Sequence, residues 1–216
     1  MIMAREQIST VKQALLIMAL APLLALFLVV LVNVGKAGTP FPETCETLTN
    51  LRIQDLASFE EAPFDGLISA FASLNSLPDL ANFANDAARL VRPGGRVVLH
   101  MLNRFSVWEW LGCVARRDWS AARGVGRLHT RAFVIGGQSV QHAVYFADEA
   151  YRRFFAREFV KRGEYGLGAL RPPHTVRRIP SPIVVTLERL DVRLGGWPLL
   201  KNAGRFFVLD LERRSA

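Results

Sequence analysis

The sequence predicts an α/β fold in which parallel strands are joined by a crossover helix, and three adjacent stretches carry this prediction. The run FDGLISAF, residues 64–71, is short and apolar, as a buried strand is. Residues 76–91 then place apolar side chains at helical spacing. The run RVVLHML, residues 96–102, is apolar and β-branched, which is typical of a strand buried on both faces. Strand, helix and strand within about 40 residues indicate a right-handed parallel crossover.

The helix of this unit has sequence signals at both of its ends. Ser76 and Asp79 have the spacing of a capping box, and Pro78 suits an early helical position. The Pro-Gly-Gly sequence at 93–95 predicts that the helix ends near Arg92, because the residue before a proline is pushed out of the α region. The glycines can then reverse the chain at a small steric cost. The expected apolar face consists of Leu80, Phe83, Ala84, Ala87 and Val91.

Length and composition limit the fold to one α/β domain with an appendage. The chain has 216 residues, and 50% of them are hydrophobic, which is enough for a core. Cys45 and Cys113 are far apart in the sequence, which argues against a disulfide scaffold or a zinc site. We therefore expect no metal.

The positive charge of the chain lies in its second half. Residues 1–110 carry 8 Lys and Arg against 10 Asp and Glu, whereas residues 111–216 carry 19 against 9. This bias suits an anionic partner, but scattered arginines on a solvated surface explain it equally well. Nucleic acid is not expected as a partner, because no basic-aromatic motif organises the charge.

The N-terminal segment predicts a transmembrane helix. Residues 14–32 contain nineteen apolar residues without a polar side chain, and as a helix they would span about 29 Å. We expect a single-pass membrane protein with its α/β domain on the cytoplasmic side. The alternative is a cytoplasmic protein in which the end of this run, LFLVVLVNV at 26–34, supplies a strand of the sheet.

A hairpin and a helix are predicted in the second half of the chain. Residues 131–146, RAFVIGGQSVQHAVYF, contain two strand-like runs around a Gly-Gly pair, which indicates a β-hairpin. Residues 147–159, ADEAYRRFFAREF, have the aromatic spacing of an amphipathic helix.

Two stretches resemble a known family. Residues 64–111, from FDGLISAF through RLVRPGGRVVLHML to WEWL, resemble the middle of a class I S-adenosylmethionine-dependent methyltransferase. Residues 170–214 are similar to the tail of one bacterial branch, in which a helix precedes an antiparallel last strand. The resemblance implies a Rossmann-like sheet over 39–216, a lid-like insertion at about 117–147, and S-adenosylmethionine as the cofactor. Residues 1–38 form a separate N-terminal segment.

The resemblance also implies which residues bind the cofactor. Asp55, at the end of a strand expected at 51–55, would lie near the adenine amino group, and Leu56 would cover the adenine ring. Ser69, Ala70 and Phe71, at the end of the next strand, would line the methionine part. The alternatives are a turn or capping role for Asp55 and a core position for Phe71.

The chain departs from the family pattern at the cofactor loop. The family needs a strand followed by a Gly-rich turn, then a helix and a second strand that ends in an acidic residue. Gly35 and Gly38 resemble that turn loosely, but the residues from Gly38 to Leu51 are too few to hold the helix, the strand and a second helix. Weak or no binding of the cofactor is therefore expected.

The acceptor side of the site is predicted in the hairpin region. His129, His142 and Tyr145 could contact the substrate or act as a base, although histidines beside strands are often structural. Methyl transfer can proceed by positioning alone, so no catalytic residue is assigned. The expected function is methyl transfer to a small-molecule or lipid-linked acceptor. The alternative is a membrane-tethered, inactive remnant that acts as a binding protein or has no function.

Overall fold

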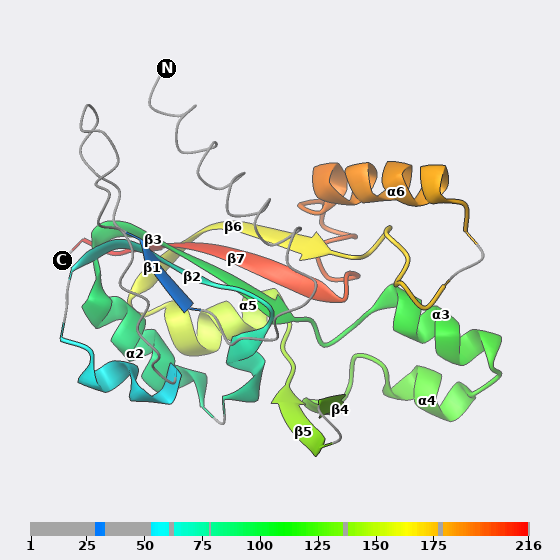
Figure 1. Cartoon of the computed structure of the whole chain (residues 1–216), viewed down its shortest axis with the longest axis horizontal. Helices are drawn as coiled ribbons and strands as arrows, with labels where there is room; N and C mark the ends of the chain where they lie inside the picture. The colour runs from blue at the N-terminus through cyan, green and yellow to red at the C-terminus, as the bar shows by residue number, and fades with distance from the viewer. Residues whose placement is uncertain are drawn as a thin grey trace.

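The computed structural model contains a five-stranded sheet, a two-stranded hairpin and the helices that pack around them (Figure 1). The strands of the main sheet have the order β1-β2-β3-β7-β6. Their bounds are β1 Val29–Val32, β2 Phe64–Ser69, β3 Val91–Leu102, β6 Phe159–Leu167 and β7 Phe206–Arg213. The structure describes residues 29–32, 53–60, 63–77, 79–135, 138–176 and 179–215.

Three strands of the sheet point the same way. β2 and β3 are parallel, whereas β7 lies between β3 and β6 and is antiparallel to both. The strands β2, β3 and β6 therefore finish at one end of the sheet, which we call its carboxyl end. This arrangement confirms the predicted α/β class, the strands expected at 64–71 and 96–102, and the antiparallel last strand implied within residues 170–214.

The crossover helix α2 (Leu80–Leu90) begins later than the sequence predicts. Asp79 is its N-cap, and the Asp79 carboxylate accepts a hydrogen bond from the amide of Ala81 at 2.8 Å. Ser76 instead ends the 3₁₀ helix η2 (Ser73–Ser76), where its hydroxyl donates to the carbonyl of Ser73 at 2.7 Å. The predicted capping box is wrong, because the chain forms this separate turn before α2 starts.

The Pro-Gly-Gly sequence forms a bulge within β3 and not a turn before it. Phe64 pairs with Val91, but Gly66 pairs with Arg96, so one residue of β2 lies opposite four residues of β3. A Cβ atom at Gly95 would lie 2.5 Å from the side chain of Val91 and 2.8 Å from a backbone oxygen of β2. Glycine is required here because the two strands approach closely.

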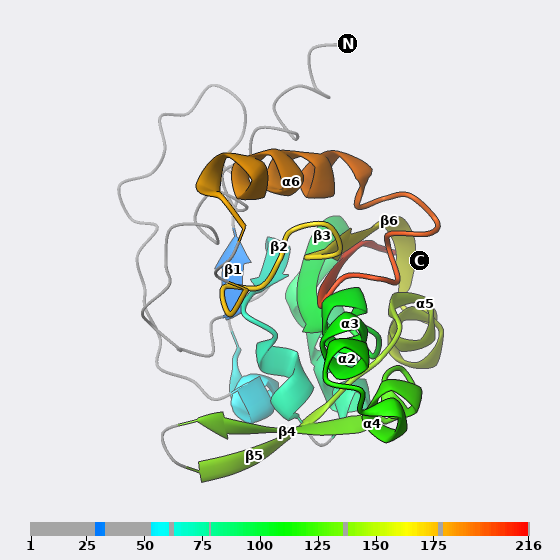
Figure 2. The same ribbon diagram turned by 90° about the vertical axis from the view of Figure 1, so that its right-hand side faces the viewer.

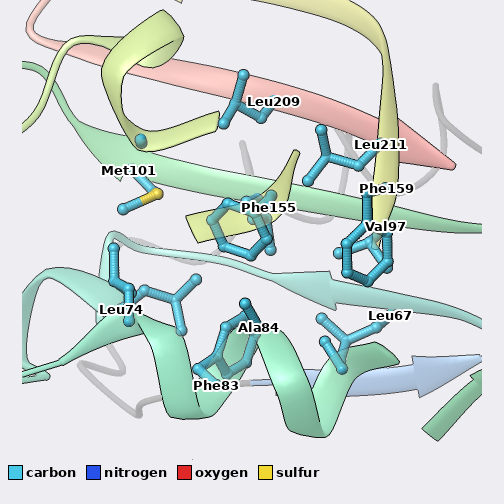
Figure 3. Packing of buried hydrophobic residues seen from close by; sticks show 14 of the residues in the cluster. Leu67, Leu74, Phe83, Ala84, Val97, Met101, Phe155, Phe159, Leu209 and Leu211 are labelled. Carbon is cyan, nitrogen blue, oxygen red and sulfur yellow. The ribbon is translucent and has the colours of Figure 1, made fainter. Parts of the chain in front are cut away.

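The main core lies between one face of the sheet and α2 (Figure 3). The predicted apolar face of α2 is buried, and alternate residues of β3 and β7 point toward it, as the period of a strand requires. The aromatic part of this core comes from the segment after the hairpin. The fully buried residues include Leu67, Leu80, Val97, Leu99, Met101, Phe155, Phe159, Phe207, Leu209 and Leu211.

The remaining elements surround the sheet (Figures 1 and 2). The expected hairpin is confirmed, since β4 and β5 pair in antiparallel fashion from Thr130 with Ala143 to Ile135 with Gln138. The helix expected at 147–159 is confirmed but ends earlier, because Phe159 already belongs to β6. The other bounds are η1 Ile53–Ser58, α3 Val107–Ala115, α4 Trp119–Gly124, β4 Thr130–Ile135, β5 Gln138–Ala143, α5 Ala147–Ala150, the π-helix η3 Tyr151–Phe155 and α6 Ser181–Leu194.

Helix α6 is held at the carboxyl end of the sheet by one buried carboxylate. Asp191 is 5% exposed and accepts hydrogen bonds from three successive amides, those of Gly168, Ala169 and Leu170, at 2.6, 2.9 and 2.7 Å. These amides follow directly after β6. A charged acceptor that serves three backbone donors fixes the start of this loop against the helix.

Two predicted elements at the N-terminal side are wrong. Of the strand expected at 51–55, the described residues 53–55 belong instead to the 3₁₀ helix η1, which packs on α2. Residues 29–32, expected as the end of a transmembrane helix, form β1 and pair with β2 in antiparallel fashion, from Val29 opposite Ser69 to Val32 opposite Gly66. This corresponds to the alternative in which the apolar run supplies a strand.

The rest of the predicted transmembrane helix, residues 14–28, lies outside the described residues, and attachment through it stays a prediction. Among the helices that the structure describes, none has the length and apolar character needed to cross a bilayer.

Candidate functional site

The candidate site lies where β2 and β3 end, at the carboxyl end of the sheet. In open α/β sheets, ligands bind outside the carboxyl ends of the strands. Figure 1 shows that α3, α4 and the β4–β5 hairpin extend from this same end of the molecule, and α6 lies above it. The loops that follow β2 and β3 are therefore placed beside several elements that could enclose a bound molecule.

A strained turn follows β2. Phe71 and Ala72 have φ angles of 57° and 56°, which place two successive non-glycine residues in the left-handed region. Such residues cost about 1–2 kcal/mol each and cluster at functional sites. Phe71 is 39% exposed, so its ring is presented at the surface and is not part of the core.

Two buried serines on either side of this turn contact each other and stabilise it. The hydroxyl oxygens of Ser69 and Ser73 lie 3.0 Å apart, and both residues are buried. Asn75, which has no exposed surface, accepts a hydrogen bond from the amide of Leu102 at 2.9 Å and donates to the carbonyl of Ala143. Asn75 therefore links the turn after β2 to the end of β3 and to the base of the hairpin.

Arg104 is the centre of a polar cluster after β3. Its guanidinium forms an ion pair with Glu149 at 2.6 Å, and the same nitrogen lies 2.9 Å from Nδ1 of His129. It also contacts the carbonyl of Val144 at 3.4 Å and lies over the ring of Phe146, 5.2 Å from the ring centre. Arg104 is 9% exposed, so this cluster connects the end of β3 to the hairpin in a largely desolvated setting.

Four buried polar atoms near this end have no hydrogen-bond partner within the described part of the chain. They are Oδ1 of Asn103, Nε of Arg104, Nδ1 of His100 and Nε1 of Trp108. Burial lowers the pKa of His100 to about 4, so the ring is neutral at pH 7. Its ring stacks on Phe206 with the ring centres 4.7 Å apart. Unpaired buried groups are costly, and a polar ligand could satisfy them.

The residues predicted to bind the cofactor fall into two groups. Ser69, Ala70 and Phe71 lie at the end of β2, where the resemblance implies them. Asp55 and Leu56 lie on η1, whose carbonyls accept hydrogen bonds from Arg89, with the Leu56 oxygen at 2.7 Å. Arg89 is the second-last residue of α2. The turn after β2 comes before the first residue of α2 in the sequence.

The two groups lie on different elements, because η1 packs on α2 whereas the other three residues lie at the end of β2. The expected position of Asp55 at a strand end is wrong, because the segment is a 3₁₀ helix. Leu56 is 5% exposed and belongs to the main core.

The predicted acceptor-side residues have different surroundings. His129 is exposed and contacts Arg104, as described above. His142 is buried in the hairpin, with Nδ1 3.3 Å from the carbonyl of Val140 and its ring edge-on to Phe133. Tyr145 follows the hairpin, its carbonyl accepts a hydrogen bond from the amide of Arg104 at 2.9 Å, and burial raises the pKa of its hydroxyl. Of the three, His129 and Tyr145 lie beside the arginine cluster.

Sequence reasoning missed Asn75, Asn103 and Arg104. The last two carried a signal, because they are the first polar residues after a strongly apolar strand, and strand ends are where α/β sheets bind ligands. Asn75 carried none, since its partners are 27 and 68 residues away in the sequence.

Comparison with known proteins gives a likeness of fold. No protein-family model matches the chain, and neither does a curated protein sequence. A solved structure of a candidate S-adenosylmethionine-dependent methyltransferase from Listeria monocytogenes resembles it with a TM-score of 0.44 and 12% identity. The match covers 77% of this chain and 68% of the other.

Proposed function

We propose that this chain is a methyltransferase of the S-adenosylmethionine-dependent class that acts on a small-molecule or lipid-linked acceptor. The observation that carries the proposal is the strained turn at Phe71 and Ala72, at the end of the strand where the sequence resemblance implies the methionine part of the cofactor. The sheet order β2-β3-β7-β6, with an antiparallel last strand preceded by a helix, agrees with the same resemblance.

The turn supports a binding role because it holds two successive non-glycine residues at positive φ at the carboxyl end of β2. Glycine would adopt these φ angles without steric cost, and the side chain of Phe71 is 39% exposed. Strain of this kind persists where the surrounding structure supports a functional geometry. In the proposal, Ser69, Ala70 and Phe71 lie along the methionine part of the cofactor, which supplies an electrophilic methyl group.

The ribose part of the cofactor fits the described residues poorly. The carboxylates near the carboxyl end already have partners: Asp79 caps α2, Glu109 pairs with Arg131 and Glu149 pairs with Arg104. β1 lies beside β2, where the resemblance calls for the strand that leads into the Gly-rich turn. Because β1 is antiparallel, it leaves the sheet at the opposite end, at Val32.

This direction of β1 favours a second candidate function. A domain that keeps the acceptor side but lacks a cofactor loop beside Ser69 would bind the acceptor molecule without transferring a methyl group. The polar cluster at Arg104 and the hairpin would serve that role unchanged. The two candidates differ in one measurable property, which is the affinity for the cofactor.

Titration calorimetry of the full chain with S-adenosylmethionine and S-adenosylhomocysteine separates the two. Micromolar affinity supports the transferase, and the absence of measurable binding supports the acceptor-binding protein. The variant Phe71→Gly should relieve the strain and raise stability by up to about 1 kcal/mol while weakening binding. Arg117→Gly is the matched control, because Arg117 has a φ of 59° far from the β2 turn in sequence. Equal effects of both variants on binding would contradict the site.

A further inference from the structure

The segment formed by α3, α4 and the turn after them exposes large apolar side chains. Trp110 is 40% exposed, Leu111 42%, Trp119 59% and Leu128 60%. Isolated apolar residues on a surface are ordinary, but four within 19 residues, three of them on α3 and α4 and one in the turn after α4, mark an interaction site. We refer to this segment, residues 107–128, as the α3–α4 surface.

The same surface is strongly basic. Arg116, Arg117, Arg123 and Arg127 are all exposed, and none of the four forms an ion pair within the described part of the chain. The two acidic residues of the surface are engaged in other contacts. Glu109 pairs with Arg131, and the Asp118 carboxylate accepts the amide hydrogen of Ala121 at 2.9 Å as the N-cap of α4.

We propose that the α3–α4 surface binds an anionic lipid bilayer. Tryptophan and leucine side chains enter the boundary between headgroups and acyl chains, and unpaired arginines are attracted to anionic headgroups, each by about 1 kcal/mol. Both chemistries occur on this one helical pair. A nucleic acid would satisfy the arginines and could stack on the tryptophans, but it would leave the exposed leucines without an apolar partner.

The position of this surface would bring the candidate site close to a bound bilayer. Figures 1 and 2 show α3 and α4 at the carboxyl end of the sheet, directly after the polar cluster in the chain. Val107, the first residue of α3, is three residues after Arg104. A lipid-linked acceptor could then reach the site from the bilayer. This extension rests on the proposed function, whereas the membrane contact is independent of it.

Tryptophan quenching by brominated lipids tests the contact locally. The full chain is mixed with vesicles of brominated phosphatidylcholine and phosphatidylglycerol in equal amounts, and the fluorescence decrease is followed against lipid concentration. This readout reports the depth of the indole rings, and Trp197, which is 59% exposed and lies outside the surface, is the ring that has to be distinguished from Trp110 and Trp119. The variant Trp110→Phe with Trp119→Phe should remove most of the quenching, which assigns it to this surface.

The charge of the surface is tested by a triple variant, Arg116→Gln, Arg117→Gln and Arg123→Gln. Three lost arginines should raise the lipid concentration needed for half of the quenching on the order of 100-fold. The matched control is Arg157→Gln with Arg214→Gln. These residues adjoin paired ends of β6 and β7 at the opposite end of the sheet, and this variant should behave as the unmodified chain.

Several results would overturn the proposal. Equal quenching by vesicles of phosphatidylcholine alone, quenching that survives the triple arginine variant, or binding to single-stranded RNA without binding to vesicles would each do so. Calorimetry with S-adenosylhomocysteine on the same preparation reports on the proposed function separately. Loss of cofactor binding with intact quenching would leave the membrane surface standing and reject only the transferase.

Discussion

The ion pair between Arg104 and Glu149 offers a direct test of how the acceptor side of the site is held together. The Arg104 side chain is 10% exposed and that of Glu149 29%, and their nearest atoms are 2.6 Å apart. Arg104→Met keeps the apolar stem of the side chain and removes the guanidinium. Glu149→Gln removes the charge of its partner and keeps its shape.

The expected magnitude lies between two measured limits. Exposed ion pairs contribute up to about 1 kcal/mol, whereas removing one partner of a fully buried pair costs about 3–5 kcal/mol. For this partly buried pair we expect a coupling free energy of about 2 kcal/mol. Arg104→Met also removes the contacts to His129 and to the carbonyl of Val144, so the single variant should lose about 3 kcal/mol.

Urea unfolding of the two single variants and the double variant measures this coupling as a double-mutant cycle. Arg171 and Glu188 provide the comparison pair, because they are about half exposed and 3.7 Å apart, and their coupling should stay below about 0.5 kcal/mol. A coupling for Arg104 and Glu149 as small as that of the comparison pair would refute the reasoning.

Three further predictions concern other parts of the structure. Asp191→Asn should lower hydrogen-exchange protection of the amides at 168–170 and in α6 by at least tenfold, since it weakens hydrogen bonds to a charged acceptor. Gly95→Ala should lower the free energy of unfolding by at least about 2 kcal/mol in urea, because the new Cβ would lie 2.5 Å from the side chain of Val91. Lowering the pH from 7 to 5 should cost about 2 kcal/mol through His100, whose pKa of about 4 lies below that of the unfolded chain, so that only the unfolded chain takes up the proton.

Each of these has its own control. Protection of β3 and β7 should not change in Asp191→Asn, and a uniform loss over the sheet would show that α6 is not an independent unit. Gly124→Ala should be neutral or stabilising, because nothing lies within 4 Å of a Cβ there. His100→Phe should remove most of the stability loss between pH 7 and 5, and a full loss that persists in it would assign the effect to other groups.

The crossover could be read from the sequence because its signals are local. Apolar residues at helical spacing identify the buried face of α2, and continuous apolar runs identify the strands β2 and β3. Both patterns depend only on residues close together in the sequence. The hairpin was predictable for the same reason, whereas the last strand was implied by the resemblance of residues 170–214 to a family tail. The capping box at Ser76 failed because two helix starts, η2 and α2, compete within six residues and the sequence does not rank them.

The N-terminal apolar run shows the limit of such signals. Residues 29–32 satisfy a membrane helix and a strand equally well by composition, and periodicity does not separate the two for short apolar runs. Pairing with β2 is a non-local contact, so its existence and its antiparallel direction come from the tertiary structure. The shortness of the segment available for the cofactor loop was visible in the sequence, whereas the direction of β1 was not.

The sequence by itself determined the fold class, the crossover, the strand that ends at Ser69, and the excess of arginine in the second half. Only the tertiary structure decided that Asp55 lies on a 3₁₀ helix and not at a strand end, and that Asn75, Arg104, His129 and Glu149 join segments up to 68 residues apart. It also placed the tryptophans and unpaired arginines of the α3–α4 surface at the carboxyl end of the sheet. Local patterns fix which face of an element is buried, but the neighbours of a polar side chain depend on packing between distant segments.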